Sequence, residues 1–282
     1  MTLRTECAVN AVEAARVLGG DSRSRLSAGG TLLMRAVNEG DPSFDLIVRH
    51  ADPQVLSLRL QADRLHIGAA VTMSALLASP DAACLHAAAR QVGGPAIRNM
   101  ATVGGNLFAP SPYGDLATAL LALDATYTSV DDTNPRPLES LFALRATHTV
   151  AGSPIARPPV VLELQCRRPA AEADFRFLKV SRVKPKGISV MAIAVHLPGS
   201  ATGARLQQVR IAFGAMGATP LRAVSAERAL EGQTLGEPSI AAATAVALDG
   251  LHPDTDAIAS RWYRQTVAPV HLGRALRAGG RR

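Results

Sequence analysis

One stretch of the sequence decides the fold: residues 95–123 read Pro95-Ala-Ile-Arg-Asn-Met-Ala-Thr-Val-Gly-Gly-Asn-Leu-Phe-Ala-Pro-Ser-Pro-Tyr-Gly-Asp-Leu-Ala-Thr-Ala-Leu-Leu-Ala-Leu123. Gly104 and Gly105 have no Cβ, so the backbone at these positions can approach a ligand closely. Thr102, Asn106 and Ser111 place short side chains with donor groups around the glycines. Free backbone N–H groups in a glycine-rich turn bind anions. The loop is therefore predicted to hold a phosphate.

The same stretch ends in an apolar segment, Leu116 to Leu123, which Asp115 precedes. The carboxylate of Asp115 could cap the helix that this segment forms, or it could accept hydrogen bonds from a ribose diol. With phosphate donors at one end and a diol acceptor at the other, the stretch suits a nucleotide.

A second glycine pair lies upstream, at Gly29-Gly30. The pattern predicts a strand over 25–28, a turn at the glycines and a helix over 31–38 that ends at Gly40. Backbone donors and the helix dipole would favour an anion at this turn. Taken alone, a Gly-Gly pair is more often an ordinary tight turn. The presence of the second loop downstream favours a phosphate-binding role for both.

The order Ile-Arg-Asn-Met-Ala-Thr-Val-Gly-Gly-Asn-Leu, then Ser-Pro, then Gly-Asp-Leu, resembles the FAD-binding (medium) subunits of molybdenum hydroxylases. This family includes the carbon monoxide dehydrogenase, xanthine dehydrogenase and aldehyde oxidoreductase types. Further matches lie at Ala28–Leu33, Phe177–Arg182 and Arg210–Arg222, so the resemblance covers nearly the whole chain. Both glycine pairs in this order make the signal specific.

The resemblance implies an α+β fold. A two-lobed FAD-binding domain of the vanillyl-alcohol oxidase (PCMH) type would hold FAD between its lobes, and a smaller C-terminal α+β domain would follow. The sequence lacks the G-x-G-x-x-G pattern of a Rossmann unit. By resemblance, the residues that contact FAD are Ala28, Gly29, Gly30, Thr31, Leu32, Leu33, Thr102, Val103, Gly104, Gly105, Asn106, Ser111, Asp115 and Ile188. Ile188 would pack near the isoalloxazine ring.

We expect the FAD-binding domain over residues 1–168, with lobes of about 1–54 and 55–168, and the C-terminal domain over 169–282. The C-terminal domain is predicted to contain a three-stranded sheet followed by helices. Its predicted strands are 175–180, 189–196 and 207–213, and its predicted helices are 222–231, 239–248 and 258–278.

One segment departs from the family pattern. Relatives often carry an acidic residue where this chain has Gly187, which leaves open whether the turn beside the flavin keeps its geometry. Lys184 and Lys186 could stabilise an anionic reduced flavin or attract a nicotinamide nucleotide. The alternative is a solvated basic turn.

The family also implies the electron path. FAD on this chain would receive electrons from 2Fe-2S clusters of a small subunit, and a large molybdopterin subunit would oxidise the organic substrate. The complex would be a dimer of heterotrimers, with NAD, a quinone or oxygen as acceptor. The three cysteines are too few for the four thiolates of a typical cluster on this chain. The sequence predicts no catalytic side-chain set and no metal site.

Composition and hydropathy narrow the class of protein that the sequence can encode. The chain has 282 residues, 48% of them hydrophobic, which is enough to build a core. No apolar run approaches the roughly 20 residues of a membrane helix, and the N-terminal sequence does not resemble a signal peptide. A soluble cytoplasmic protein is expected. The net charge of +7 is spread along the chain and aromatic residues make up only 4%, which argues against nucleic-acid binding.

Two other functions stay open at this point. The first is a stand-alone flavin reductase of related fold, such as the UDP-N-acetylenolpyruvoylglucosamine reductases. That class needs a proton donor in its own substrate pocket, and the sequence shows no such motif. The second is a flavin-free structural or assembly subunit, against which the intact glycine pairs and Asp115 argue.

Overall fold

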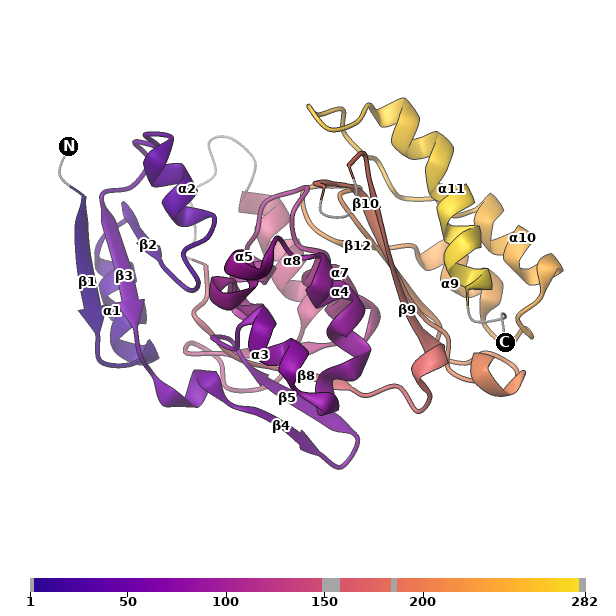
Figure 1. Cartoon of the computed structure of the whole chain (residues 1–282), viewed down its shortest axis with the longest axis horizontal. Coiled ribbons are helices and arrows are strands. Elements are labelled where there is room, and N and C mark those ends of the chain that lie inside the picture. Colours follow the sequence, from indigo (N-terminus) through magenta and orange to yellow (C-terminus); the bar gives the residue numbers. More distant parts are fainter. Residues whose placement is uncertain (1–2, 149–157, 184–186, 279–282) are drawn as a thin grey trace.

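The computed structural model describes residues 3–148, 158–183 and 187–278. Three regions follow one another along the longest axis of the molecule (Figure 1). An N-terminal lobe lies at one end, a second lobe occupies the middle, and the C-terminal domain lies at the other end. Each region has its own sheet. This is the α+β architecture that the family resemblance implies.

The N-terminal lobe is a three-stranded parallel sheet in the order β1-β3-β2 with two helices. Its elements are β1 (Arg4–Ala8), α1 (Ala11–Gly20), β2 (Ser24–Leu26), α2 (Leu33–Asn38) and β3 (Leu46–His50). Asn10 caps α1, since its Oδ1 accepts a hydrogen bond of 2.9 Å from the backbone N–H of Glu13. The predicted strand before Gly29 and the predicted helix after Gly30 are both present, each shorter than expected.

The middle lobe is built on a five-stranded sheet in the order β4-β5-β8-β6-β7, in which neighbouring strands are antiparallel. The strands are β4 (Leu58–Gln61), β5 (Arg64–Gly68), β6 (Thr126–Ser129), β7 (Arg136–Pro137) and β8 (Val161–Arg167). The helices are α3 (Met73–Ala78), α4 (His86–Gln91), α5 (Pro95–Met100), α6 (Val103–Leu107), α7 (Asp115–Ala122) and α8 (Leu138–His148), with short 3-10 helices at Pro53–Leu56 and Pro80–Leu85. The stretch at residues 95–123 therefore forms three consecutive helices.

The C-terminal domain is an antiparallel sheet in the order β12-β11-β10-β9, covered by three helices. The elements are β9 (Phe175–Ser181), β10 (Ser189–His196), β11 (Arg210–Gly214), β12 (Leu221–Arg222), α9 (Val224–Leu230), α10 (Glu237–Ala245) and α11 (Arg261–Arg277), with 3-10 helices at Glu172–Asp174 and Ser200–Thr202. All three predicted strands are present. The two-residue strand β12 is a fourth that the sequence analysis did not include.

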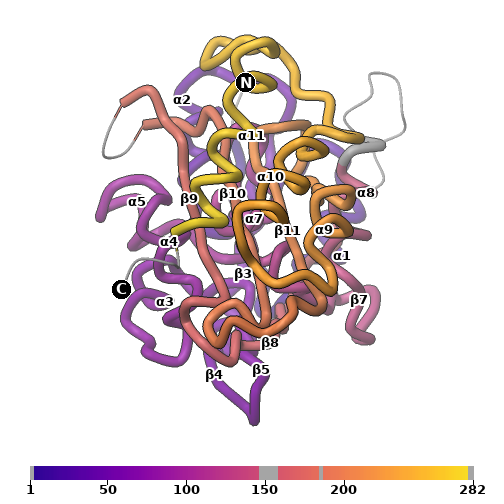
Figure 2. The backbone as a smooth tube through the Cα atoms, turned by 90° about the vertical axis from the view of Figure 1, so that its right-hand side faces the viewer, coloured from indigo at the N-terminus to yellow at the C-terminus, as the bar shows by residue number. Residues whose placement is uncertain are grey.

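Helix α7 lies against the C-terminal sheet, and all eight of its residues are buried. Ala194 of β10 and Ala212 of β11 belong to the same hydrophobic core as α7. The alternate residues of these strands, such as Ile193 and Phe213, face the other way into a core shared with α9, α10 and α11. Figure 2 shows those three helices in front of the sheet. Small side chains on one face of the sheet let α7 approach closely.

Helix α7 and the sheet approach each other closely at Gly214 of β11. A Cβ at this position would lie 2.3 Å from Oγ1 of Thr118 on α7, so no larger residue fits without a shift. The apolar segment after Asp115 thus forms the layer between the two domains. No helix in the described part of the chain is long and apolar enough to cross a membrane.

Candidate functional site

The two glycine loops lie against each other. A Cβ on Gly29 would sit 1.9 Å from the carbonyl oxygen of Met100, at the end of α5. A Cβ on Gly105 would lie 3.4 Å from Cβ of Ala28. The N-terminal lobe and the middle lobe therefore meet at the segments 28–33 and 100–106. The structure brings together the two loops that the sequence assigns to one ligand.

The first loop presents unpaired backbone donors. The N–H groups of residues 28–33 donate to no acceptor within the described residues, whereas Ser27 N and Met34 N on either side are bonded to the carbonyls of Val48 and Gly30. Gly30 has a φ of +70°, a conformation that favours glycine. A run of free N–H groups in such a turn is suited to bind an anion.

The second loop differs from the first in that its backbone N–H groups at residues 103–106 are not free. Its N–H groups are engaged inside the protein: Val103 with Val71 O (2.9 Å), Gly104 with Ala69 O (2.8 Å), Gly105 with Thr102 Oγ1 (3.1 Å) and Asn106 with Thr102 O (3.0 Å). The expectation of free donors in this loop is therefore wrong for residues 103–106. The glycines serve close packing instead, since a Cβ on Gly104 would lie 2.8 Å from Cβ of Ala69.

Asn106 holds the start of α7. Its Oδ1 accepts a hydrogen bond of 2.9 Å from the backbone N–H of Ala117, in the first turn of the helix. The N-cap residue is Gly114, whose φ of +103° favours glycine, and Asp115 makes no capping hydrogen bond. The capping role considered for Asp115 is wrong, because Asn106 fills it from the preceding loop.

Asp115 instead joins the two domains. One carboxylate oxygen accepts a hydrogen bond of 2.7 Å from Ser189 Oγ, and the other lies 2.7 Å from Nζ of Lys179. Lys179 also donates to the carbonyl oxygen of Gln91 at 3.1 Å. The sequence analysis assigned no role to Lys179 or Ser189, although Lys179 lies in a segment that matches the family. A contact between Asp115 and a ribose stays a prediction.

The turn between β9 and β10 places Ile188 next to Ser189, with 39% of its surface exposed. Gly187 precedes it, and a Cβ there would lie 2.4 Å from the carbonyl oxygen of Val183. In this backbone conformation the turn has no room for the acidic side chain that relatives often carry. Lys184 and Lys186 lie outside the described residues.

Tyr113 links the middle lobe to α2. Its hydroxyl oxygen accepts a hydrogen bond of 3.0 Å from Nη1 of Arg35. Arg35 also forms an ion pair of 2.8 Å with Glu39, the residue that directly follows α2. Ser111, which the sequence assigns to the FAD site, is exposed in the same turn as Tyr113. No sequence signal pointed to the pair of Arg35 and Tyr113.

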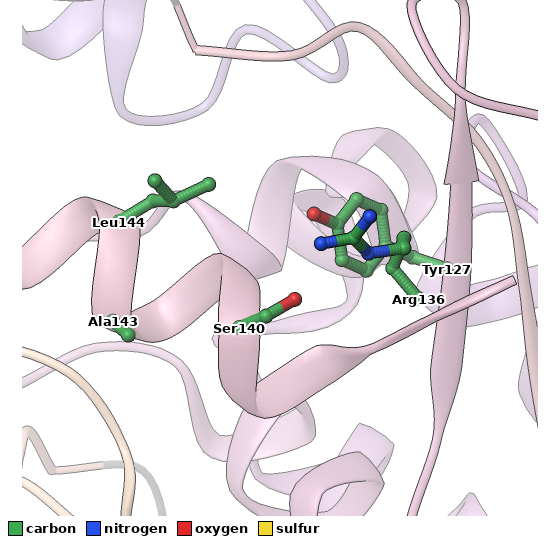
Figure 3. Close-up of a pocket in the computed structure, with 5 residues that line it drawn as sticks. All are labelled: Tyr127, Arg136, Ser140, Ala143 and Leu144. Carbon is green, nitrogen blue, oxygen red and sulfur yellow. The ribbon is translucent and has the colours of Figure 1, made fainter.

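Two cavities lie elsewhere. One of about 330 Å³ has Ser140, Ala143 and Leu144 of α8 on one side and Tyr127 and Arg136 on the other (Figure 3). The second, of about 170 Å³, lies between α4 and β9 and is lined in part by Cys84, His86 and Arg90. Neither contains a predicted site residue. The described residues hold no cluster of three or more side chains that could bind a metal ion.

The glycine loops fit FAD on the structure's own evidence. Free N–H groups at 28–33 match a diphosphate, and the missing Cβ of Gly29 lets the two lobes close on each other. Ile188 is an exposed apolar residue of the C-terminal domain, and its contact with a flavin ring stays a prediction.

Comparison with known proteins decides the family. The family model for the FAD binding domain in molybdopterin dehydrogenase matches residues 2–154, and that for the CO dehydrogenase flavoprotein C-terminal domain matches residues 176–278. The chain belongs to the FAD-binding medium subunits of molybdenum hydroxylases. As a medium subunit of this family it is part of an oxidoreductase, and it carries the family's FAD-binding domain.

Named relatives agree with this assignment. The nicotinate dehydrogenase FAD-subunit of Eubacterium barkeri is 29% identical, over 84% of this chain and 82% of the relative. A putative xanthine dehydrogenase FAD-binding subunit of Escherichia coli K12 is 26% identical, over 97% of this chain and 96% of the relative. Among solved structures, a carbon monoxide dehydrogenase from Hydrogenophaga pseudoflava superposes on this medium subunit with a TM-score of 0.87 at 23% identity, covering 99% of this chain and 98% of that one. This last likeness shows the shared fold.

Proposed function

We propose that this medium subunit binds FAD at the two glycine loops and passes electrons from 2Fe-2S clusters of a partner subunit to an external acceptor. The observation that carries the proposal is the run of unpaired N–H groups at 28–33, held against the second loop by the contact of Gly29 with Met100. These donors are suited to the diphosphate of a dinucleotide.

The chemistry belongs to the cofactor, since bound FAD accepts electrons singly and releases them in pairs. The residues of this chain bind the cofactor and orient it. The amides of 28–33 hold the diphosphate, and Gly30 keeps the turn in the conformation that exposes them. The second loop fixes α7 through Asn106. Ile188, on the turn before β10, contacts the flavin ring, and Asp115 lies on the ribose or adenosine side.

We further propose that the partners are a small 2Fe-2S subunit and a large molybdopterin subunit, arranged as a dimer of heterotrimers. Each cluster needs several thiolates at one place. The chain has only three cysteines, and they differ in their surroundings: Cys7 is exposed on β1, Cys84 lines the cavity beside β9 and Cys166 is buried in β8. NAD or a quinone is the proposed acceptor, and a cytoplasmic location stays a prediction.

The first test is a visible absorption spectrum of the purified chain after incubation with FAD and removal of free FAD by gel filtration. A retained oxidised-flavin spectrum is expected. The same measurement on the complex purified from the native host covers the case in which partners are needed for binding. A complex that stays free of flavin would overturn the proposal in favour of a structural subunit.

The second test concerns the partners. Affinity purification of the tagged chain from its host should recover a subunit with 2Fe-2S clusters and a subunit with molybdopterin, both detectable by spectroscopy and cofactor analysis. An FAD-loaded chain that is recovered without either partner and turns over a substrate with NADPH would show a stand-alone reductase instead.

A further inference from the structure

The helix that follows the first glycine loop carries a cation, Arg35, that no sequence pattern indicates. Arg35 lies on α2, four residues after Thr31 of the first loop. Its guanidinium reaches the hydroxyl of Tyr113, which lies between the second loop and α7. The Arg35–Tyr113 hydrogen bond therefore joins the segments that follow the two loops. It bridges the same two lobes that meet at Gly29 and Met100.

Because the proposed ligand is negatively charged, a cation at the site would favour its binding. The diphosphate of FAD carries two negative charges, and the predicted contact residues include no cation. Their one charged member, Asp115, is negative and is paired with Lys179. Arg98 of the nearby α5 donates to the carbonyl oxygens of Arg90 and Gly93.

Arg35 has donors left for a ligand. Its Nε is bonded to Glu39 and its Nη1 to Tyr113, while Nη2 donates to none of the described residues. The side chain is 57% exposed, so a bound anion can reach it. Planar guanidinium groups bind phosphate through two parallel N–H groups.

We propose that Arg35 is a diphosphate-binding residue of the FAD site and that Tyr113 positions its guanidinium over the loops. This inference rests on the proposed function, because it assigns residues to the same ligand. Arg35 supplies the positive charge that the backbone amides of 28–33 lack, and its hydrogen bond to the Tyr113 hydroxyl ties the side chain to the middle lobe.

The experiment measures the affinity of the full chain for FAD, ADP and adenosine by isothermal titration calorimetry. Arg35→Gln should weaken binding of FAD and of ADP by about 10- to 150-fold, the effect of losing hydrogen bonds to a charged group. Binding of adenosine should stay unchanged, because adenosine has no phosphate. Arg35→Lys should recover part of the loss. Raising the salt concentration should weaken FAD binding less in Arg35→Gln than in the unaltered chain.

The matched control is Arg16→Gln. Arg16 lies on α1, is 74% exposed and forms an ion pair with Glu13, three residues earlier on the same helix. Its replacement should leave all three affinities unchanged. Tyr113→Phe tests positioning: it should weaken ADP binding by a smaller factor, and the double variant Arg35→Gln/Tyr113→Phe should bind ADP no worse than Arg35→Gln alone.

Two results would overturn the inference. Unchanged affinity for ADP in Arg35→Gln would remove Arg35 from the site, while FAD binding by the unaltered chain would leave the proposed function standing. Equal losses for ADP and adenosine would show that Arg35 only supports the fold. If the native complex itself holds no FAD, the proposed function fails, and the role of Arg35 fails with it.

Discussion

Nζ of Lys179 lies 2.7 Å from a carboxylate oxygen of Asp115, and this ion pair joins β9 of the C-terminal domain to the first residue of α7. The side chains are only 9% and 7% exposed. Charges so deeply buried are stable only when each one is paired and hydrogen-bonded. Ser189 donates a further hydrogen bond to Asp115, and the carbonyl oxygen of Gln91 accepts one from Lys179, so both charges are also hydrogen-bonded.

We therefore predict that Lys179→Met lowers the free energy of unfolding by about 3–5 kcal/mol, because it leaves a buried carboxylate without a counter-charge. Urea unfolding of the full chain, followed by circular dichroism, measures the change. The double variant Asp115→Asn/Lys179→Met should lose less stability than the two single variants added together. Simple additivity would show that the two side chains do not interact.

The contact between Gly29 and Met100 predicts the effect of a single methyl group. In Gly29→Ala the new Cβ would fall 1.9 Å from the Met100 carbonyl oxygen, so the two loops must move apart. FAD retention after gel filtration should be lost or strongly reduced. Gly20→Ala is the control, since a Cβ at Gly20 meets nothing within 4 Å. Full retention of FAD by Gly29→Ala would contradict the arrangement of the loops.

Close packing of α7 on the C-terminal sheet predicts a suppressor. Gly214→Ala should lower the melting temperature, because its Cβ would lie 2.3 Å from Thr118 Oγ1. Adding Thr118→Ala removes that hydroxyl and leaves the Cβ atoms about 3.5 Å apart, an ordinary contact distance. Differential scanning calorimetry should find the double variant more stable than Gly214→Ala alone. If Thr118→Ala lowers stability further in that background, the clash is not the cause.

Burial raises the pKa of the Cys84 thiol to about 11. Since the thiolate is the reactive form, at pH 8 only about 0.1% of Cys84 is reactive. In a Cys7→Ser background, the thiol reagent DTNB should label the native chain slowly, and the rate should rise about tenfold per pH unit up to about pH 11. Fast labelling at pH 8 in this background would mean that the α4–β9 cavity opens in solution.

The sequence predicts much of the fold because local patterns decide it. The glycine pairs, the Asn10 cap and the alternating strands of the C-terminal domain need only nearby residues to be recognised. Strand β1 was missed because four of its five residues are exposed and carry no apolar alternation. It forms through pairing with β3, some 40 residues along the chain.

The site is harder to predict, since it depends on which donors remain free after folding. Both glycine loops look alike as sequence, yet only the first keeps unpaired N–H groups; Val71, Ala69 and Thr102 accept those of the second. The partners of Asp115 and Arg35 lie 64 and 78 residues away. No local spacing can indicate such contacts.

The position of α7 has a consequence for how the chain can be divided. The family models treat residues 2–154 and 176–278 as separate modules, but Ala194 and Ala212 of the second module complete the core around the helix of the first. A fragment that ends before β9 would leave the apolar surface of α7 open to water and prone to aggregate. The two modules are recognised separately in the sequence, yet they should melt in one cooperative transition, and neither is a suitable unit for expression by itself.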